Sequence, residues 1–255
     1  MISVNWIMWT EDRRWSHPEL KMALMNRRFF IPAATASGLA PGWLLAAARP
    51  ERVQVLRGDT LTRISRRHGL SVTELRLWNG LTSDLIQVGQ EIWLKPRYTQ
   101  IPLAKITQPR IKAGRWKNII AHHSATPNGS AAIFDEYHRV AQGREHGLAY
   151  HFVIGNGTNS PDGKVEVGGR WLKQANGGHV RSAEYNSCSI GICLVGNFEK
   201  TQPTTKQIKS LIELSDYLKH RMFRGRLKFF VHKELEKTLC PGRHFPLTRF
   251  HQLFS

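Results

Sequence analysis

The spacing of apolar residues changes at about the middle of the chain. Between residues 52 and 96, apolar positions first alternate as in a β-strand, then recur every three or four residues as in two short helices. A second alternating run, Ile92-Trp93-Leu94, follows. Gly69 and the Asn79-Gly80 pair are typical of helix ends and turns. This order predicts a small βααβ module over residues 52–96.

Longer apolar runs alternate with amphipathic segments over residues 116–255. The runs expected to form strands are 119–121, 148–157, 162–171, 187–198 and 227–235. Helical spacing covers 131–143 and 204–222. This alternation predicts an α/β domain with a mixed central β-sheet and helices on both faces. Residues 97–115 contain prolines and scattered lysines and arginines, and we expect them to be a linker.

The N-terminal part has the order of a targeting segment. Arg27 and Arg28 precede a moderately apolar stretch that contains two prolines and closes on three alanines. This pattern predicts a twin-arginine signal peptide within residues 1–48, and therefore export to the periplasm or cell envelope. A membrane anchor is the alternative, but the prolines disfavour a stable spanning helix. Met25 directly precedes the Asn-Arg-Arg stretch, so we expect it, rather than Met1, to be the true start.

Charge and cysteine content limit the possible partners and chemistry. The formal net charge is +18, which attracts polyanions such as nucleic acids, membrane lipids or wall polymers, without choosing among them. The three cysteines, Cys188, Cys193 and Cys240, are too few and odd in number for a disulfide framework. Cys240 is therefore free for other chemistry.

Possible metal ligands occur where predicted strands end. His122 and His123 follow one buried run, His232 ends another, and Cys240 stands in a Cys-Pro-Gly turn. Imidazole nitrogen and thiolate sulfur are preferred zinc ligands, and a catalytic site leaves one position open. The chain contains 12 histidines, so spacing alone also allows the alternative that each is a surface or hydrogen-bonded histidine.

The 52–96 module resembles the LysM module. The matching stretches are Gly58-Asp59-Thr60-Leu61, Asn79-Gly80-Leu81 and Ile86-Gln87-Val88-Gly89-Gln90. LysM modules bind glycans that contain N-acetylglucosamine, such as peptidoglycan. The resemblance implies that Gly58, Asp59, Thr60 and Ile86 contribute to substrate binding. The alternative is that these residues only form turns and caps.

The larger domain resembles the zinc-dependent N-acetylmuramoyl-L-alanine amidases of type 2, a family that includes catalytic peptidoglycan recognition proteins. The stretches "IIAHHSAT", "AYHFVIG", "NSCSIGICLVGNF" and "VHKELEKTLCPG" carry the resemblance, which spans residues 116–247. It implies the type-2 amidase fold and a Zn²⁺ cofactor held by His122, His232 and Cys240.

The resemblance also implies roles for further polar residues. Tyr150 matches the catalytic tyrosine of the family. Thr238 stands where phage amidases have a lysine, and Cys193 stands where some relatives have a glutamate. No carboxylate can therefore be assigned as the general base, and Tyr150 and Thr238 are the expected catalytic helpers. His179 either lines the substrate groove or orders its loop.

The expected function is hydrolysis of the amide bond between N-acetylmuramic acid and L-alanine in peptidoglycan, with the LysM module binding the wall. We expect a monomer with no specific nucleic-acid partner and no stable membrane span after signal removal. The alternative function is a non-catalytic peptidoglycan-binding protein. Cys240 disfavours this alternative because relatives that lose the cysteine lose zinc.

Overall fold

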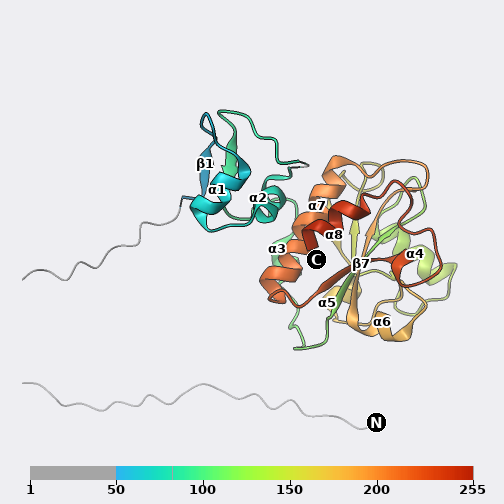
Figure 1. Cartoon of the computed structure of the whole chain (residues 1–255). Coiled ribbons are helices and arrows are strands. Elements are labelled where there is room, and N and C mark those ends of the chain that lie inside the picture. Colours follow the sequence, from blue (N-terminus) through green and yellow to red (C-terminus); the bar gives the residue numbers. More distant parts are fainter. Residues whose placement is uncertain (1–49, 82, 255) are drawn as a thin grey trace, which may run out of the picture. The chain divides into compact units, whose positions relative to one another are not determined.

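The computed structural model describes residues 50–81 and 83–254 (Figure 1). The predicted signal peptide and the choice between Met1 and Met25 lie outside the described residues. No helix among the described residues is long and apolar enough to span a membrane.

The first element group is the predicted βααβ module. Strands β1 (Arg52–Gln54) and β2 (Glu91–Trp93) pair antiparallel, and helices α1 (Leu61–His68) and α2 (Val72–Asn79) connect them. Each helix begins at a side-chain cap and ends at a left-handed glycine, because only glycine adopts a positive φ without strain. The helices pack on the strand pair through the buried side chains of Val55, Leu61, Ile64, Leu75, Ile92 and Leu94.

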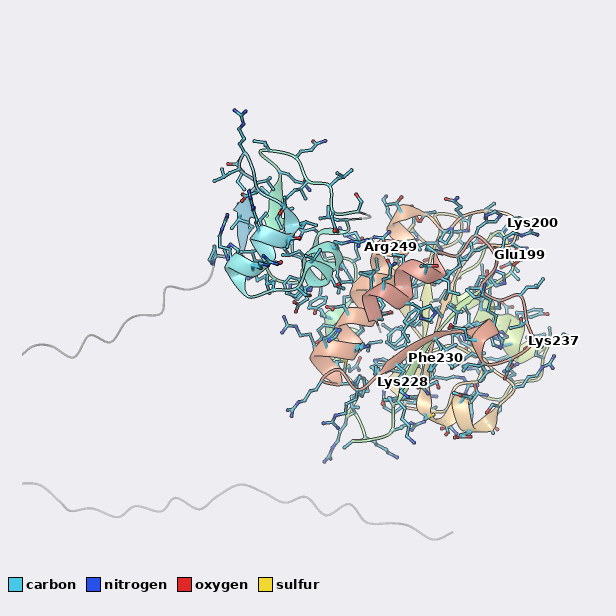
Figure 2. All side chains as sticks on the ribbon, viewed as in Figure 1. Glu199, Lys200, Lys228, Phe230, Lys237 and Arg249 are labelled. Carbon is cyan, nitrogen blue, oxygen red and sulfur yellow. The ribbon has the colours of Figure 1, made fainter. Side chains whose placement is uncertain are left out.

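A five-stranded sheet forms the centre of the larger domain. Its strands are β3 (Asn118–His123), β4 (Phe152–Ile154), β5 (Val165–Val167), β6 (Ser189–Leu194) and β7 (Lys228–Val231). The order is β5-β4-β6-β3-β7, and only β5 runs antiparallel to its neighbour. The prediction of a mixed α/β sheet is confirmed. Figure 2 labels Lys228, at the beginning of β7.

Helices cover both faces of this sheet. One face packs in the main core with α7, α8 and two short helices, while α4 lies on the other face with Phe134 buried. The helices are α3 (Leu103–Ile106), α4 (Ala131–Val140), α5 (Gly169–Leu172), α6 (Ala183–Cys188), α7 (Thr205–Asp216) and α8 (Leu247–Phe254), with a π-helical segment at Tyr217–Met222 and a 3₁₀ turn at His232–Glu234.

Strand β3 divides its side chains between the two faces. Ile119 and Ala121 lie in the main core. His122 pairs in register with Cys193, which packs with α4 on the opposite face. Since successive side chains in a strand point to opposite faces, His122 faces the α4 side and His123 faces the main core.

The segment expected to be a linker is packed against the larger domain. Ile101 and Ile106 are buried in the main core, and the indole of Trp171 donates a 3.0 Å hydrogen bond to the carbonyl of Ile106. The Tyr98 hydroxyl donates a 2.7 Å hydrogen bond to Asp216 on α7. Residues 97–115 contain two prolines and five basic residues and show no helix or strand periodicity, so the sequence did not reveal these anchoring side chains.

We predict that Ile106→Ala lowers the free energy of unfolding by about 2–4 kcal/mol, because Ile106 is completely buried and its truncation leaves a cavity. Leu103→Ala on the same short helix is the matched control, since Leu103 is exposed and its truncation should change stability by less than about 0.5 kcal/mol. Chemical denaturation measures both. Equal effects of the two substitutions would contradict the packed arrangement.

Candidate metal centre

Parallel pairing of β3 with β7 brings two histidines to one edge of the sheet. Ala121 pairs with Val231, so His122 and His232, the next residue in each strand direction, lie side by side with ring centroids 4.7 Å apart. Cys240 approaches from the loop after β7. The nearest donor atoms of the two imidazoles and the thiol all lie within 4.8 Å of one another. This cluster could hold a metal ion.

The sulfur of Cys240 faces Nδ1 of His122 at 3.7 Å and accepts a hydrogen bond from the backbone N–H of His123 at 3.4 Å. The imidazole of His123 points away, where its Nδ1 accepts a hydrogen bond from the backbone N–H of Phe198 at 3.1 Å. Strand alternation thus separates the adjacent histidines, and only His122 joins the cluster. Burial raises the pKa of the Cys240 thiol to about 12 in the absence of a metal.

The other ring nitrogen of His122 is fixed by His179. Nε2 of His122 lies 3.0 Å from Nδ1 of His179, while Nε2 of His179 lies 3.4 Å from the carbonyl of Ser189. A carbonyl can only accept, so the N–H of His179 belongs on Nε2 and its Nδ1 accepts from His122. Burial and then the neighbouring His151 lower the pKa of His179 to about 3, so this ring is neutral. His122 therefore directs the lone pair of Nδ1 towards Cys240.

His232 is fixed in the same way by Glu236. Nε2 of His232 donates to Oε2 of Glu236 at 3.0 Å. Oε1 of Glu236 accepts from the backbone N–H groups of Arg181 and Ser182 at 2.6 and 3.1 Å. Burial alone would raise the pKa of Glu236, but the hydrogen bonds from His232, Ser182 and Arg181 outweigh it and lower the pKa. The carboxylate thus joins the loop before α6 to the cluster.

The sequence patterns did not identify Glu236 as a hydrogen-bond partner of His232. Its signal was the spacing of four residues after His232, which suits a side-chain contact across one turn.

The two expected catalytic helpers lie beside the cluster in different ways. The ring of Tyr150 lies 5.3 Å from that of His122. Burial, and next the thiol of Cys193, raise the pKa of Tyr150 well above its ordinary value, so its hydroxyl stays protonated. The hydroxyl oxygen of Thr238 accepts a 3.2 Å hydrogen bond from the backbone N–H of Cys240. Thr238 therefore orders the turn that carries the thiol.

His179 was expected either to line a groove or to order its loop. The structure buries it behind His122, with its backbone N–H bonded to the side chain of Asn186. Two glycines make room for its ring, because a Cβ at Gly191 or Gly177 would lie 2.3 or 2.5 Å from its Cδ2. His179 therefore contacts the cluster directly, through Nε2 of His122.

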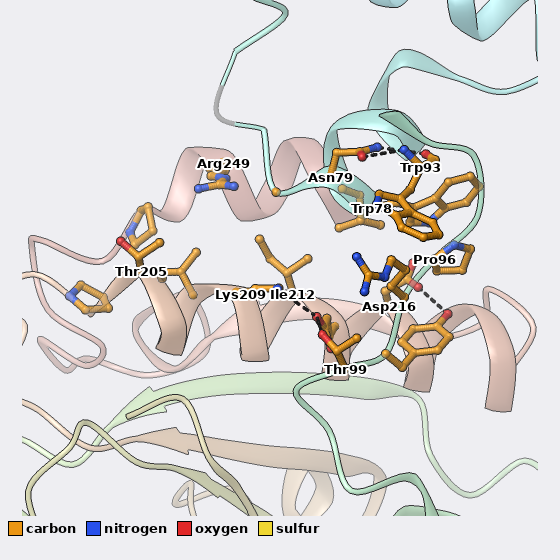
Figure 3. A pocket seen from close by; sticks show the side chains of 18 of the residues that line it. Trp78, Asn79, Trp93, Pro96, Thr99, Thr205, Lys209, Ile212, Asp216 and Arg249 are labelled. Carbon is orange, nitrogen blue, oxygen red and sulfur yellow. Dashed lines mark hydrogen bonds and ion pairs between the residues drawn. The ribbon is translucent and has the colours of Figure 1, made fainter. Parts of the chain in front are cut away.

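A cavity of about 700 Å³ lies away from the histidine–cysteine cluster, and Figure 3 shows it from close by. Its lining includes Trp78, Trp93 and Lys209, and none of the three cluster residues. In Figure 3, Asn79 lies against Trp93, whose backbone N–H and carbonyl both bond its side chain. The cavity is thus separate from the histidine–cysteine cluster.

Comparison with known families identifies both parts of the chain. Residues 112–243 match the family model described as N-acetylmuramoyl-L-alanine amidase, and residues 53–95 match the LysM domain. The chain belongs to the N-acetylmuramoyl-L-alanine amidase family. The cluster of His122, His232 and Cys240 lies entirely within the amidase match.

Individual relatives cover parts of the chain. It is 34% identical over 116 residues to the cell wall-binding protein YocH of Bacillus subtilis, covering 46% of this chain and 37% of YocH. It is 51% identical over 41 residues to an autolysin of Enterococcus faecalis, covering 16% of this chain and 6% of the autolysin. It is 30% identical over 100 residues to peptidoglycan-recognition protein 2 of Holotrichia diomphalia, covering 36% of this chain and 48% of that protein.

Among solved structures, the amidase LysCS from Clostridium intestinale is 31% identical with a TM-score of 0.45, covering 52% of this chain and 80% of that one. The match with the curated relatives YocH and the autolysin spans well under half of the length of each of those two proteins.

The residues of the LysM domain expected to bind glycan lie at one end of that domain. Gly58, Asp59 and Thr60 form the turn between β1 and α1. Asp59 accepts the N–H of Leu56 at 3.0 Å and pairs with Arg67 at 2.9 Å, so its carboxylate already orders the turn. Thr60 caps α1.

Ile86 is half-buried against the core of the LysM domain. The residues that follow it lie beside the end of β1, because Gly89 donates a 2.8 Å hydrogen bond to Val55. The neighbouring Leu85 is 85% exposed. Leu85 therefore offers more free apolar surface than Ile86 does.

We predict that Gly191→Ala displaces His179 and lowers the free energy of unfolding by about 1–3 kcal/mol, because the new methyl group would overlap the imidazole. Gly169→Ala is the control, since a Cβ there meets nothing within 4 Å. Thermal unfolding of the metal-free protein compares them. An unchanged stability of Gly191→Ala would show that His179 does not occupy this position.

Proposed function

We propose that the protein hydrolyses the amide bond between the lactyl group of N-acetylmuramic acid and L-alanine of the peptidoglycan stem peptide. The observation that carries the proposal is the convergence of His122, His232 and Cys240 within the amidase domain. Cys240 completes the donor set, which favours hydrolysis over the alternative of a non-catalytic peptidoglycan-binding protein.

We propose Zn²⁺ as the metal. Two imidazole nitrogens and one thiolate sulfur suit its ligand preference and leave a position for water or substrate. The hydrogen-bond pattern fits this ion, because both imidazoles engage Nε2 elsewhere and keep Nδ1 for a ligand. When bound, Zn²⁺ supplies a Lewis acid that polarises the scissile carbonyl and lowers the pKa of water.

The side chains around the cluster orient its ligands and contact the substrate in this proposal. His179 and Glu236 hold the rings of His122 and His232 in orientation. Thr238 holds the turn of Cys240 through its backbone N–H. The protonated hydroxyl of Tyr150 donates a hydrogen bond to the carbonyl oxygen as negative charge develops there.

The LysM domain keeps the enzyme on its substrate in this proposal. The turn at Gly58, Asp59 and Thr60 and the loop around Ile86 bind the glycan strand, and the domain raises the local concentration of amide bonds at the active site. Residues 1–48 direct export by the twin-arginine route, which carries folded proteins. The protein acts as a monomer in the cell envelope, either in the periplasm or at the wall.

The direct test is product analysis after incubation of the purified protein with peptidoglycan sacculi. We expect released stem peptides with new N-terminal alanine and no new reducing sugar ends, and we expect a chelator to stop release. Tyr150→Phe should lower kcat by about 10²–10³ with little change in KM, since it removes one donor to the oxyanion. Binding to sacculi without release of peptides would instead support the non-catalytic alternative.

We predict that Glu236→Gln lowers zinc affinity by about 10–100-fold, because the neutral amide holds the ring of His232 less firmly. Chelator competition with the purified protein measures the affinity independently of activity. Glu184→Gln, an exposed residue on the nearby α6, is the control and should leave the affinity unchanged. Equal affinities of both variants would remove Glu236 from its positioning role.

A further inference from the structure

Basic side chains gather at the end of the larger domain that is opposite to the metal cluster. We call this surface the basal face. It consists of seven exposed residues: Arg110, Lys112, Lys117, Lys173, Arg224, Arg226 and Lys228.

The topology of the sheet brings these residues together. Lys117 directly precedes β3, and Lys228 begins the neighbouring β7, with the Lys228 N–H donating a 3.0 Å hydrogen bond to the Lys117 carbonyl. Arg224 and Arg226 lie in the turn that leads into β7. The basic side chains therefore lie at the amino ends of two adjacent parallel strands.

The remaining residues reach the same end through short connections. Lys173 follows α5, which comes after the only antiparallel strand of the described sheet and therefore lies at the amino ends of the others. The indole of Trp116 donates a 2.8 Å hydrogen bond to Gln174, which joins this helix end to the start of β3. Arg110 and Lys112 lie in the loop that enters β3.

Carboxylates are scarce around the basal face. No Asp or Glu occurs between Glu91 and Asp135, between Glu166 and Glu184, or between Asp216 and Glu234. The last residue of α6, Cys188, lies at this end, because its carbonyl accepts a hydrogen bond from the Lys117 N–H, and Glu184 is the one carboxylate on this helix. Among the described residues, no ion pair or side-chain hydrogen bond engages any of the seven bases. Their charges are therefore available to a partner.

The basal face lies far enough from His122 that a partner bound to it would not cover the histidine–cysteine cluster. His122 stands near the carboxyl end of the strand whose amino end carries Lys117, so the two ends are separated by the length of β3, about 20 Å. In Figure 2, Lys228 lies well away from Glu199 and Lys200, which follow β6 in the chain. A partner on the basal face leaves the metal cluster free to face the wall.

We propose that the basal face docks on the surface of a membrane rich in anionic phospholipids. Multiple unpaired bases attract an anionic bilayer, and each contributes about fivefold to the binding constant. Leu172 on α5 is the neighbour of Lys173, and Leu103 lies on α3, which contacts α5; these two side chains are 39% and 37% exposed. Such side chains suit the headgroup boundary better than a nucleic-acid backbone. The attachment is peripheral and does not depend on hydrolysis.

The test is co-sedimentation of the full-length chain with vesicles of phosphatidylcholine alone or mixed with phosphatidylglycerol. We expect binding to the mixed vesicles that weakens as NaCl rises from about 0.05 to about 0.3 M, because salt screens the attraction. The double substitution R226E/K228E should weaken this binding at least about tenfold.

The matched control is K200E/K206E, which changes the net charge equally at exposed positions outside the basal face. It should retain nearly all binding. R110E/K112E alters only a loop, so it tests the face independently if substitutions at β7 impair folding, which circular dichroism detects. Sedimentation with a soluble polyanion, a DNA duplex, runs in parallel.

Equal loss of vesicle binding in the basal-face and control variants would overturn the proposal, since it would reduce the effect to net charge. Absence of vesicle binding together with tight DNA binding that R226E/K228E abolishes would also overturn it, and would assign the face to nucleic acid. Selective loss in both basal-face variants supports it. Product release from sacculi is scored separately, so failure of the docking proposal is distinguishable from failure of the proposed hydrolysis.

Discussion

The parallel pairing of β3 with β7 determines where the histidines of the site lie. These strands are separated by more than a hundred residues in the sequence, yet their register places His122 and His232 at one edge. Backbone hydrogen bonds fix this register, so neither imidazole depends on a mobile loop for its position. The same pairing brings Lys117 and Lys228 together at the opposite end. The histidine–cysteine cluster and the basal face therefore lie at opposite ends of the same strand pair.

A second layer of hydrogen bonds determines which atoms of the imidazoles face the cluster. His179 and Glu236 differ in chemistry, one neutral and one anionic, but each accepts from Nε2 of a clustered histidine. Both hold residues of the loop before α6, since His179 lies in it and Glu236 binds two of its backbone N–H groups. Orientation of the two rings and order of this loop are therefore coupled. These hydrogen bonds engage Nε2 of both histidines and leave the two Nδ1 atoms as donor atoms of the cluster.

Local patterns in the sequence predicted the elements well, because caps, glycine turns and apolar periodicity act over a few residues. The βααβ module and the mixed sheet followed from such patterns. The packing of residues 97–115 did not, since two buried isoleucines anchor a segment of basic and proline-rich composition. Resemblance to a family singled out His122, His232 and Cys240. Glu236 was missed because it stands in a charged stretch of the sequence, and only the fold shows that its carboxylate contacts His232.

Long-range ¹⁵N–¹H NMR measures the tautomeric state of the histidines in the metal-free protein. We expect His122 and His232 both to carry their proton on Nε2, because that atom donates to His179 and Glu236. On addition of Zn²⁺, the signals of both Nδ1 atoms should shift. A proton on Nδ1 of either residue, or zinc bound through Nε2, would show that the hydrogen bonds to His179 and Glu236 do not preset the site.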